Sequence, residues 1–373
     1  MTDDHLRVRS GSLVAHRLWD VADTIDLARA ERLWSSHEGR EARRIQLGAA
    51  AARKLAFEVP PAQLLLSPVP LVLDGRPARA HASARLYDFG VIAIALRVDV
   101  ADVEWAGFTA QCNALDHAVG ATAQVDVWTP VLEAVLEVIA PAVRRPATHR
   151  LEEDYLFALV RSFDTPLTGA QVQERADLAA LLSGETRPLS QQESSEVTAQ
   201  SFSYFEDDLV VVTWDRAFVY EPRGDTDVTD ILEVANAQLL EMRYYDELLD
   251  DELPTMYDLV ENARGGLSLL ASRRAARLAR KLYSLVAEVT ELTERVDNTL
   301  QVTEDVYLAR IHTATLELFR VPKLSAAVDR KLSIIRETCV SLYEEAASRR
   351  AELLEVAIVL LIMFEIVLAL VRH

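Results

Sequence analysis

In its first part the chain alternates between two patterns of apolar and polar residues, each typical of one kind of secondary structure. Residues 12–19 and 85–98 are apolar runs with the composition of β-strands. Residues 25–34 carry an apolar side chain at every third or fourth position, as an amphipathic helix does. Strands interleaved with helices predict an α/β domain over residues 1–226. Within it, the polar, turn-forming stretch 183–196 marks a surface loop or the boundary of a small lobe.

From residue 227 onward nearly every window has helical periodicity, so we predict a helical bundle over residues 227–352. Two stretches of it carry apolar residues at alternating spacings of four and three, which is the period of a coiled-coil seam. A proline at 322 separates them, and a short break between two long helices favours an antiparallel coiled-coil hairpin. The main seam residues are Leu278, Leu282, Leu285, Val289, Leu292 and Val296 in the first stretch, and Leu332, Ile335 and Leu342 in the second.

The last apolar stretch, residues 353–371, has the length of a membrane-spanning helix. Nineteen residues rise about 28 Å in a helix, close to the hydrocarbon thickness of a bilayer. Their large apolar side chains favour insertion by roughly 6 kcal/mol, which exceeds the cost of about 3 kcal/mol for the carboxylate of Glu365. The chain is therefore predicted to have an α+β fold that ends in one C-terminal transmembrane helix, continuous with the bundle. A buried coiled-coil or core helix is the alternative, because Glu355 and Glu365 interrupt the stretch.

Charges around this stretch predict how it would sit in a membrane. The first residues lack the apolar core of a signal peptide, so we expect a cytoplasmic body on the plasma membrane of a bacterium. Arg349 and Arg350 would then lie at the inner membrane interface. Glu365 needs a partner, which is Arg372 seven residues on, a symmetry-related copy or another protein. We expect Glu355, Glu365 and Arg372 to make membrane or oligomer contacts.

Composition narrows the classes of function. A net charge of −19 argues against nucleic-acid binding over the whole body. The two cysteines lie far apart, in keeping with a reducing compartment and without a disulfide framework. One basic run is concentrated, and it is either a solvated bundle face or a contact for RNA, phosphate or acidic lipid headgroups. Its residues are Arg273, Arg274, Arg277, Arg280 and Lys281.

No pattern in the sequence indicates a catalytic site. The eight histidines are scattered without metal-ligand spacing, and no phosphate-binding glycine loop or nucleophile elbow is present. The acidic run at residues 246–252 lacks the glycine of a calcium-binding loop, so we interpret it as a capped helix–helix turn. We therefore expect no cofactor and no metal, and an enzyme is the less favoured class.

Three stretches resemble the family named "required for meiotic nuclear division". Residues 87–98, YDFGVIAIALRV, look like its aromatic–Asp–aromatic–Gly–Val strand, and residues 244–258, YYDELLDDELPTMYD, look like its leucine–aspartate turn before a proline. Residues 352–370, ELLEVAIVLLIMFEIVLAL, are similar to its terminal Leu-Glu and apolar helix with an internal Glu-Ile. On that match Glu355 and Glu365 are the family's two recurring carboxylates, although Val356 stands where an aromatic residue commonly follows the first.

The resemblance implies an α/β domain, helices and one C-terminal membrane span, with no established catalytic residues. Bacterial relatives are domains of unknown function, and mitochondrial members support translation. We expect a membrane-anchored scaffold or tether that homo-oligomerises through its bundle and anchor and binds an unknown protein partner. The alternatives are a channel-like or transport-like oligomer that uses an intramembrane Glu365, and a membrane-recruited enzyme of unknown chemistry.

Overall fold

The computed structural model divides the chain into two compact units. The first comprises Met1–Glu241 and Arg295–Pro322, and the second comprises Met242–Glu294 and Lys323–His373. The structure describes residues 6–36, 41–44, 56–57, 59–147, 150–264, 300–301 and 305–371, and eight residues between 277 and 290. The long helix α7 (Asp227–Arg264) contributes its first part to one unit and the rest to the other.

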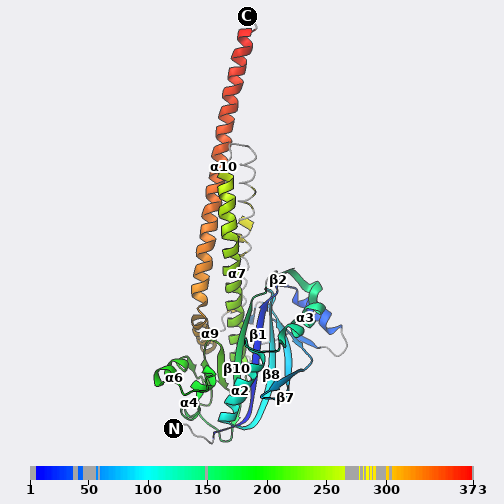
Figure 1. Cartoon of the computed structure of the whole chain (residues 1–373), viewed down its shortest axis with the longest axis vertical. Helices are drawn as coiled ribbons and strands as arrows, with labels where there is room; N and C mark the ends of the chain where they lie inside the picture. Colours follow the sequence, from blue (N-terminus) through cyan, green and yellow to red (C-terminus); the bar gives the residue numbers. More distant parts are fainter. Residues whose placement is uncertain are drawn as a thin grey trace. The chain divides into compact units, whose positions relative to one another are not determined.

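A ten-stranded mixed sheet is the centre of the first unit in the part of the chain that is described (Figure 1). Its order is β11-β12-β13-β10-β1-β8-β7-β5-β3, with β6 paired to β7, and only the pair β10–β13 is parallel among these neighbours. The strands are β1 (Arg7–Asp20), β3 (Ala42–Arg44), β5 (Ala62–Leu65), β6 (Val69–Leu73), β7 (Arg76–Leu86), β8 (Val91–Glu104), β10 (Glu152–Phe163), β11 (Ser201–Phe202), β12 (Leu209–Val212) and β13 (Arg216–Tyr220).

Smaller elements complete this unit. Two-stranded ribbons join β2 (Ala22–Ile25) to β9 (Val143–Pro146), and β4 (Ala56–Phe57) to β14 (Leu300–Gln301). Its other helices are α1 (Leu27–Ser35), α2 (Trp105–Val119), α3 (Trp128–Ile139), α4 (Gly169–Arg175), α5 (Leu178–Ser183), α6 (Gln191–Val197) and α9 (Val306–Leu318), with a 3₁₀ turn at Ala140–Ala142. The stretch predicted as a loop or lobe boundary, residues 183–196, runs from the end of α5 into the exposed helix α6.

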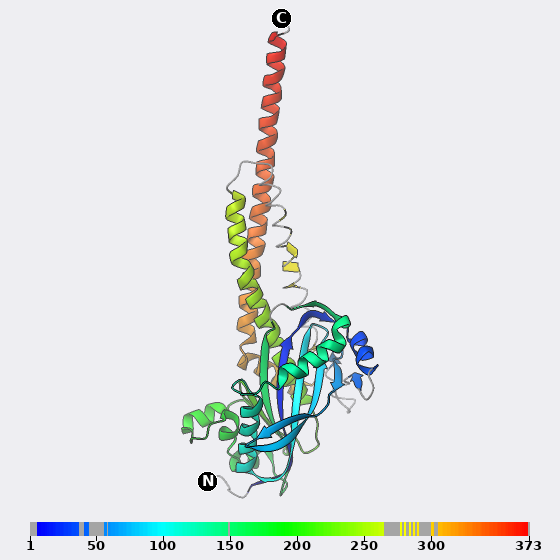
Figure 2. The same ribbon diagram turned by 45° about the vertical axis from the view of Figure 1, so that its right-hand side comes forward.

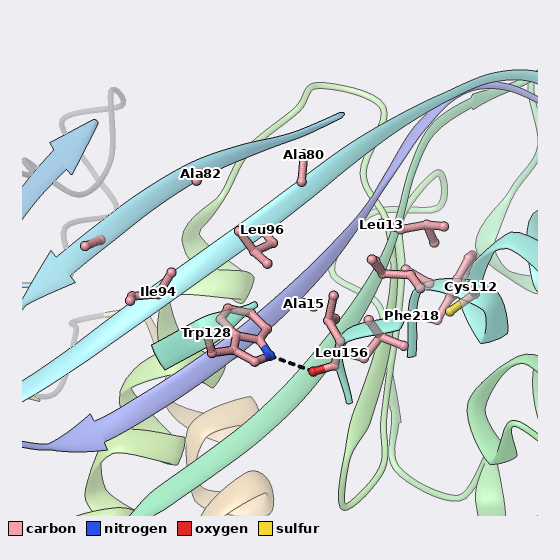
Figure 3. Close-up of a cluster of buried hydrophobic side chains, with 14 of the residues drawn as sticks. Leu13, Ala15, Ala80, Ala82, Ile94, Leu96, Cys112, Trp128, Leu156 and Phe218 are labelled. Atoms are coloured by element: carbon pink, nitrogen blue, oxygen red, sulfur yellow. Dashed lines mark hydrogen bonds between the residues drawn. The ribbon is translucent and has the colours of Figure 1, made fainter. Parts of the chain in front are cut away.

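The central strand β1 is covered on both faces, since its residues from Ser12 to Asp20 are all buried. Successive side chains of a strand point to opposite faces. Leu13 and Ala15 point into the core beneath α2 and α3, where Trp128 closes the layer and its indole N–H donates to the Val119 carbonyl at 2.6 Å (Figure 3). The side chains at the alternate positions of β1 lie on the opposite face, where His16 contacts Glu233 of α7. A strand buried on both faces reads as a continuous apolar run, which explains why the sequence pattern identified it.

The turn at Tyr87–Gly90 connects β7 to β8 and is held against the end of β1. The Val21 N–H donates to the Gly90 carbonyl at 3.1 Å, and the Ile25 N–H donates to the Asp88 carbonyl at 3.0 Å. Gly90 has a φ of +101°, and a Cβ there would lie 1.6 Å from the Ala22 carbonyl oxygen. Only glycine fits this position, because both the backbone conformation and the space exclude a side chain.

In the second unit, α7 and α10 (Val321–Val371) run side by side in the same direction (Figures 1 and 2). Lys331 ties them together, with its ammonium 2.6 Å from Asp246 and 2.7 Å from Asp250. The apolar seam of α10 is buried here at Val328, Leu332, Ile335 and Cys339. The acidic run at residues 246–252, which was predicted to be a helix–helix turn, instead lies within α7. This helix continues through Pro254 without a break.

The first helix of the predicted coiled-coil hairpin, with seam residues from 278 to 296, lies largely outside the described residues. Of its seam only Val289 is described, and it is helical and buried. Leu278, Leu282, Leu285, Leu292 and Val296 lie outside the description, as does the side chain of Leu342 in α10. In the part of the chain that is described, the helix packed along α10 is thus α7, which is parallel to it.

The predicted transmembrane anchor is wrong: none of the described helices combines the length and apolarity needed to cross a bilayer. The observed architecture is mixed α/β with a large sheet, and α10 continues through residues 353–371 as a helix. Glu355 and Glu365 leave an uninterrupted apolar run of only nine residues, Val356–Phe364, about 14 Å of helix. A bilayer needs about 20 apolar residues, and summing insertion energies over the whole stretch overlooked this division.

Other predictions that depended on the anchor are wrong with it. The predicted tail-anchored topology, the location at a bacterial plasma membrane and the interfacial role of Arg349 and Arg350 all depended on that span. The intramembrane role of Glu365 depended on it as well. Both arginines lie within α10, and their side chains are outside the description.

Replacing Gly90 by alanine is expected to lower the free energy of unfolding by about 3 kcal/mol or more, because the new methyl group meets the Ala22 carbonyl. Gly75→Ala is the matched control: its φ is +74°, but nothing lies within 4 Å of the added Cβ, so about 1 kcal/mol is expected. Urea denaturation of both variants measures the difference. Equal losses would show that the close approach at Gly90 does not matter.

Candidate functional site

A buried ionic cluster joins α7 to the sheet in the first unit. It comprises His16 on β1, Arg85 on β7, Tyr87 in the following turn, and Asp230 and Glu233 on α7. Asp230 and Glu233 are three residues apart, so they lie on the same face of the helix. We name these five residues the buried ionic cluster.

Glu233 is the centre of this cluster. The Tyr87 hydroxyl donates to its Oε1 at 2.6 Å, His16 Nδ1 lies 3.2 Å from its Oε2, and Arg85 Nη1 lies 3.3 Å from its Oε1. Burial opposes the charged form, but the Arg85 guanidinium, together with His16 and Tyr87, lowers the pKa of Glu233 to about 2. Glu233 is therefore an ionised carboxylate inside the protein.

Arg85 also binds the second carboxylate of the cluster. Its Nη1 lies 2.8 Å from Oδ1 of Asp230, and the Thr226 hydroxyl donates to Oδ2 of the same residue at 3.4 Å. Burial and the neighbouring Glu233 raise the pKa of Asp230, although Arg85 opposes this. Burial lowers the pKa of Arg85, but the two carboxylates more than offset it and hold that pKa well above its usual value. The cluster has the electrostatics of a structural ion network, because its charged groups are bonded to one another and enclosed.

A small cavity lies beside the first turns of α7 and α9. Its volume is about 30 Å³. The polar part of its lining consists of three tyrosines and five carboxylates: Tyr204, Tyr220, Tyr307, Asp208, Glu221, Asp225, Asp227 and Asp305. This volume is well below the roughly 300–1,000 Å³ that is typical of ligand pockets.

Several of these carboxylates already hold nearby backbone groups. Asp305 caps α9 by accepting from the Tyr307 N–H at 2.9 Å, and Asp208 accepts from the Tyr204 N–H at 2.8 Å. Asp225 accepts from the Asp227 N–H at 3.2 Å. Within the described ranges no group of three or more His, Cys, Asp or Glu side chains is arranged to hold a metal ion. The acidic lining is explained by turns and helix caps.

The exposed apolar segment of α10, which we define as its large apolar residues from Leu354 to Leu370, is the third candidate. Each of these side chains that is described is exposed by 42% or more. Half-exposed side chains of this size contribute on the order of 80 Å² each, so the segment exposes on the order of 1,000 Å² of apolar surface. The largest apolar patch on a typical monomeric protein is about 300–600 Å². A surface of this extent is typical of an interaction site.

The structure does not assemble the sequence-predicted site residues into one place. Glu355 and Glu365 are exposed on the apolar segment, and Arg372 lies outside the described residues. Of the predicted basic patch, Arg277 and Arg280 are helical and exposed, whereas Arg273, Arg274 and Lys281 lie outside the description. The predicted patch and the predicted oligomer contacts of the carboxylates therefore stay predictions, whereas their predicted membrane contacts are wrong together with the anchor.

The buried ionic cluster was not predicted from the sequence. Its five residues come from three distant parts of the chain, and no spacing rule connects His16 or Arg85 with a helix that begins at residue 227. One signal was present in the sequence: Asp230 and Glu233 lie beside or within residues 231–240, of which seven are apolar. Charged residues inside a helix without a solvent-facing side indicate buried partners.

One buried carboxyl beside the Tyr87–Gly90 turn has a different environment. Asp20, the last residue of β1, is buried, and its Oδ2 has no hydrogen-bond partner in the described structure. Burial raises the pKa of Asp20 to about 7, against the effect of the Ala22 N–H, and the nearby Asp23 also raises it. Asp20 therefore titrates near neutral pH in the folded protein.

Glu233→Gln is expected to lower the free energy of unfolding by about 3–5 kcal/mol, because it leaves the buried Arg85 with one carboxylate partner instead of two. The exposed pair Arg150–Glu133 gives the control, since Glu133→Gln should cost less than about 1 kcal/mol. Chemical denaturation at pH 7 measures both. A Glu233→Gln loss no larger than the control would contradict the assigned role of the cluster.

Asp20 predicts a specific dependence of stability on pH. Its folded pKa of about 7 exceeds the ordinary value of 3.8, so the folded state binds the proton more tightly than the unfolded state does. The contribution of Asp20 to stability should therefore be fully present below about pH 4 and fall by on the order of 1 kcal/mol per pH unit between about pH 5 and 7. Asp20→Asn should remove this slope and stabilise the protein at pH 8. An unchanged slope in denaturation curves would contradict the assignment.

The comparisons with known proteins bear on the first part of the chain. An uncharacterized protein MJ0711 of Methanocaldococcus jannaschii is 23% identical over 201 residues, which are 54% of this chain and 61% of the relative. The chain thus matches less than two thirds of that protein's length. No solved structure matches the chain. The resemblance to the "required for meiotic nuclear division" family stays a prediction, since neither match bears on that family.

The matched family is described as "Uncharacterized protein MJ0711, N-terminal domain" and covers residues 10–226. This range contains β1 from residue 10 onward and all of β2 to β13, and therefore nearly the whole ten-stranded sheet, together with the Tyr87–Gly90 turn. It ends just before α7, so the carboxylates of the buried ionic cluster lie beyond it. Because the match covers more than half of the 373 residues, the chain belongs to the family of the uncharacterized protein MJ0711 N-terminal domain.

Proposed function

We propose that this protein is a self-associating scaffold, in which copies of the chain bind one another through the exposed apolar segment of α10. The supporting observation is the amount of apolar surface there, on the order of 1,000 Å² per chain, above the roughly 800 Å² that each partner buries in a standard protein interface. Covering a half-exposed Leu, Ile, Val or Phe contributes about 1 kcal/mol. A segment of this length supplies enough energy to offset the entropy lost on association.

A scaffold also accounts for the character of the first unit. The central strand β1 of its sheet is buried on both faces, and the charged groups of the buried ionic cluster are bonded to one another. The carboxylate-lined cavity has a volume of about 30 Å³. A catalytic role would require a nucleophile, a base and a stabilising group around a substrate-sized space. The geometry of the first unit favours a rigid module that is presented to a protein partner, and the second unit supplies the association.

Sedimentation of the full-length chain tests this proposal. The wild-type protein should have a discrete mass above that of one chain, because burial of the segment drives association. The double variant Leu360→Glu with Met363→Glu should sediment as a monomer, since it places two carboxylates on the segment. Val125→Glu, at an exposed valine of the first unit, is the control and should leave the mass unchanged.

A monomeric wild-type chain would overturn the proposal. So would a heterogeneous aggregate without a defined mass, or flotation of the monomer with lipid vesicles. Circular dichroism of the double variant confirms that a lower mass does not result from unfolding.

A further inference from the structure

The apolar seam that packs against α7 continues into the exposed part of α10. Val328, Leu332, Ile335 and Cys339 are buried and follow spacings of four, three and four. The same alternation passes through Leu342, Ala346, Arg349 and Leu353, whose side chains lie outside the description. It then falls on five residues that are 56–73% exposed: Val356, Leu360, Met363, Val367 and Leu370. The exposed positions thus continue a coiled-coil interface that is already formed lower in the same helix.

The two carboxylates of the segment lie away from this seam. At 100° per residue, Glu365 is about 170° around the helix from the midline of Leu360 and Met363. Glu355 is about 130° from the midline of the seam at Val356. Copies that pack through the seam leave both charges in water, so association does not bury them. This placement favours a second copy of the chain as the occupant of the seam.

The positions beside the seam indicate how many copies associate. In two-stranded coiled coils the flanking positions commonly carry charged residues, which pair across the interface. Here they carry Val359, Phe364 and Ile366, all more than half exposed. Apolar flanks widen the contact face, so that one helix is able to pack against two neighbours at once.

We infer that the α10 segments of three or more copies pack into one helical bundle, with Met363 at its centre and Glu365 on its outer surface. This inference rests on the proposed self-association and adds the partner, the face and the minimum number of copies. In a parallel arrangement in register, Val359 of one helix lies beside Phe364 of the next, five residues on, the spacing of paired flanking positions.

Cysteine cross-linking tests which face is inside. The two natural cysteines, Cys112 and Cys339, are buried, so they give little background. Met363→Cys should form intermolecular disulfides under mild oxidation, at least tenfold faster than Glu365→Cys. Equal rates, or faster cross-linking at Glu365→Cys, would overturn the inferred face.

Mass measurement tests the number of copies. The wild-type chain should sediment at three or more times the chain mass. The double variant Val359→Lys with Phe364→Glu should fall to a dimer, because the flanks then pair two parallel helices by charge. A wild-type dimer would overturn this inference and leave the proposed function standing, whereas a wild-type monomer would overturn both. A double variant that keeps the wild-type mass would show that the flanks do not set the number.

Discussion

The ionised carboxylate of Glu233 is the constraint on which the first unit depends. A charge enclosed by protein is tolerated only where its partners are fixed in place, and here those partners come from β1, β7 and the Tyr87 turn. The first turns of α7 are therefore committed to one position on the sheet, since any shift would separate Arg85 from its carboxylates. Apolar packing alone would allow the helix to slide by small steps at little cost.

The same constraint explains the Tyr87–Gly90 turn. Tyr87 reaches Glu233, whereas Gly90 must lie against the Ala22 carbonyl, so the turn is fixed from both sides. An aromatic residue followed three positions later by glycine is then a structural requirement of this junction. The motif needs no catalytic explanation, although it is part of the stretch 87–98 on which the family resemblance was based. Asp20 lies next to this turn, and its Oδ2 has no hydrogen-bond partner in the described structure. Burial therefore raises the pKa of its carboxyl to about 7.

The sequence predicted those features that depend on local periodicity. The strand predicted at residues 12–19 lies within β1, and the helix predicted at residues 25–34 corresponds to α1, because the apolar pattern of each stretch is local. The order of the ten strands could not be predicted from local patterns, because β1 pairs with β8 and β10, which are both far away in sequence. The buried ionic cluster was missed for the same reason: its electrostatics exist only after the sheet has brought Arg85 beside α7.

The error at the C-terminus shows what a sum of hydropathies leaves out. A sum of insertion energies over residues 353–371 predicted a membrane span, but such a sum does not record where the two carboxylates fall. Their angular positions carry different information: Glu355 and Glu365 both avoid the face that continues the seam of Val328, Leu332 and Ile335. A stretch selected only for apolarity has no reason to keep its charges off one face, whereas a stretch that packs against other helices through that face does.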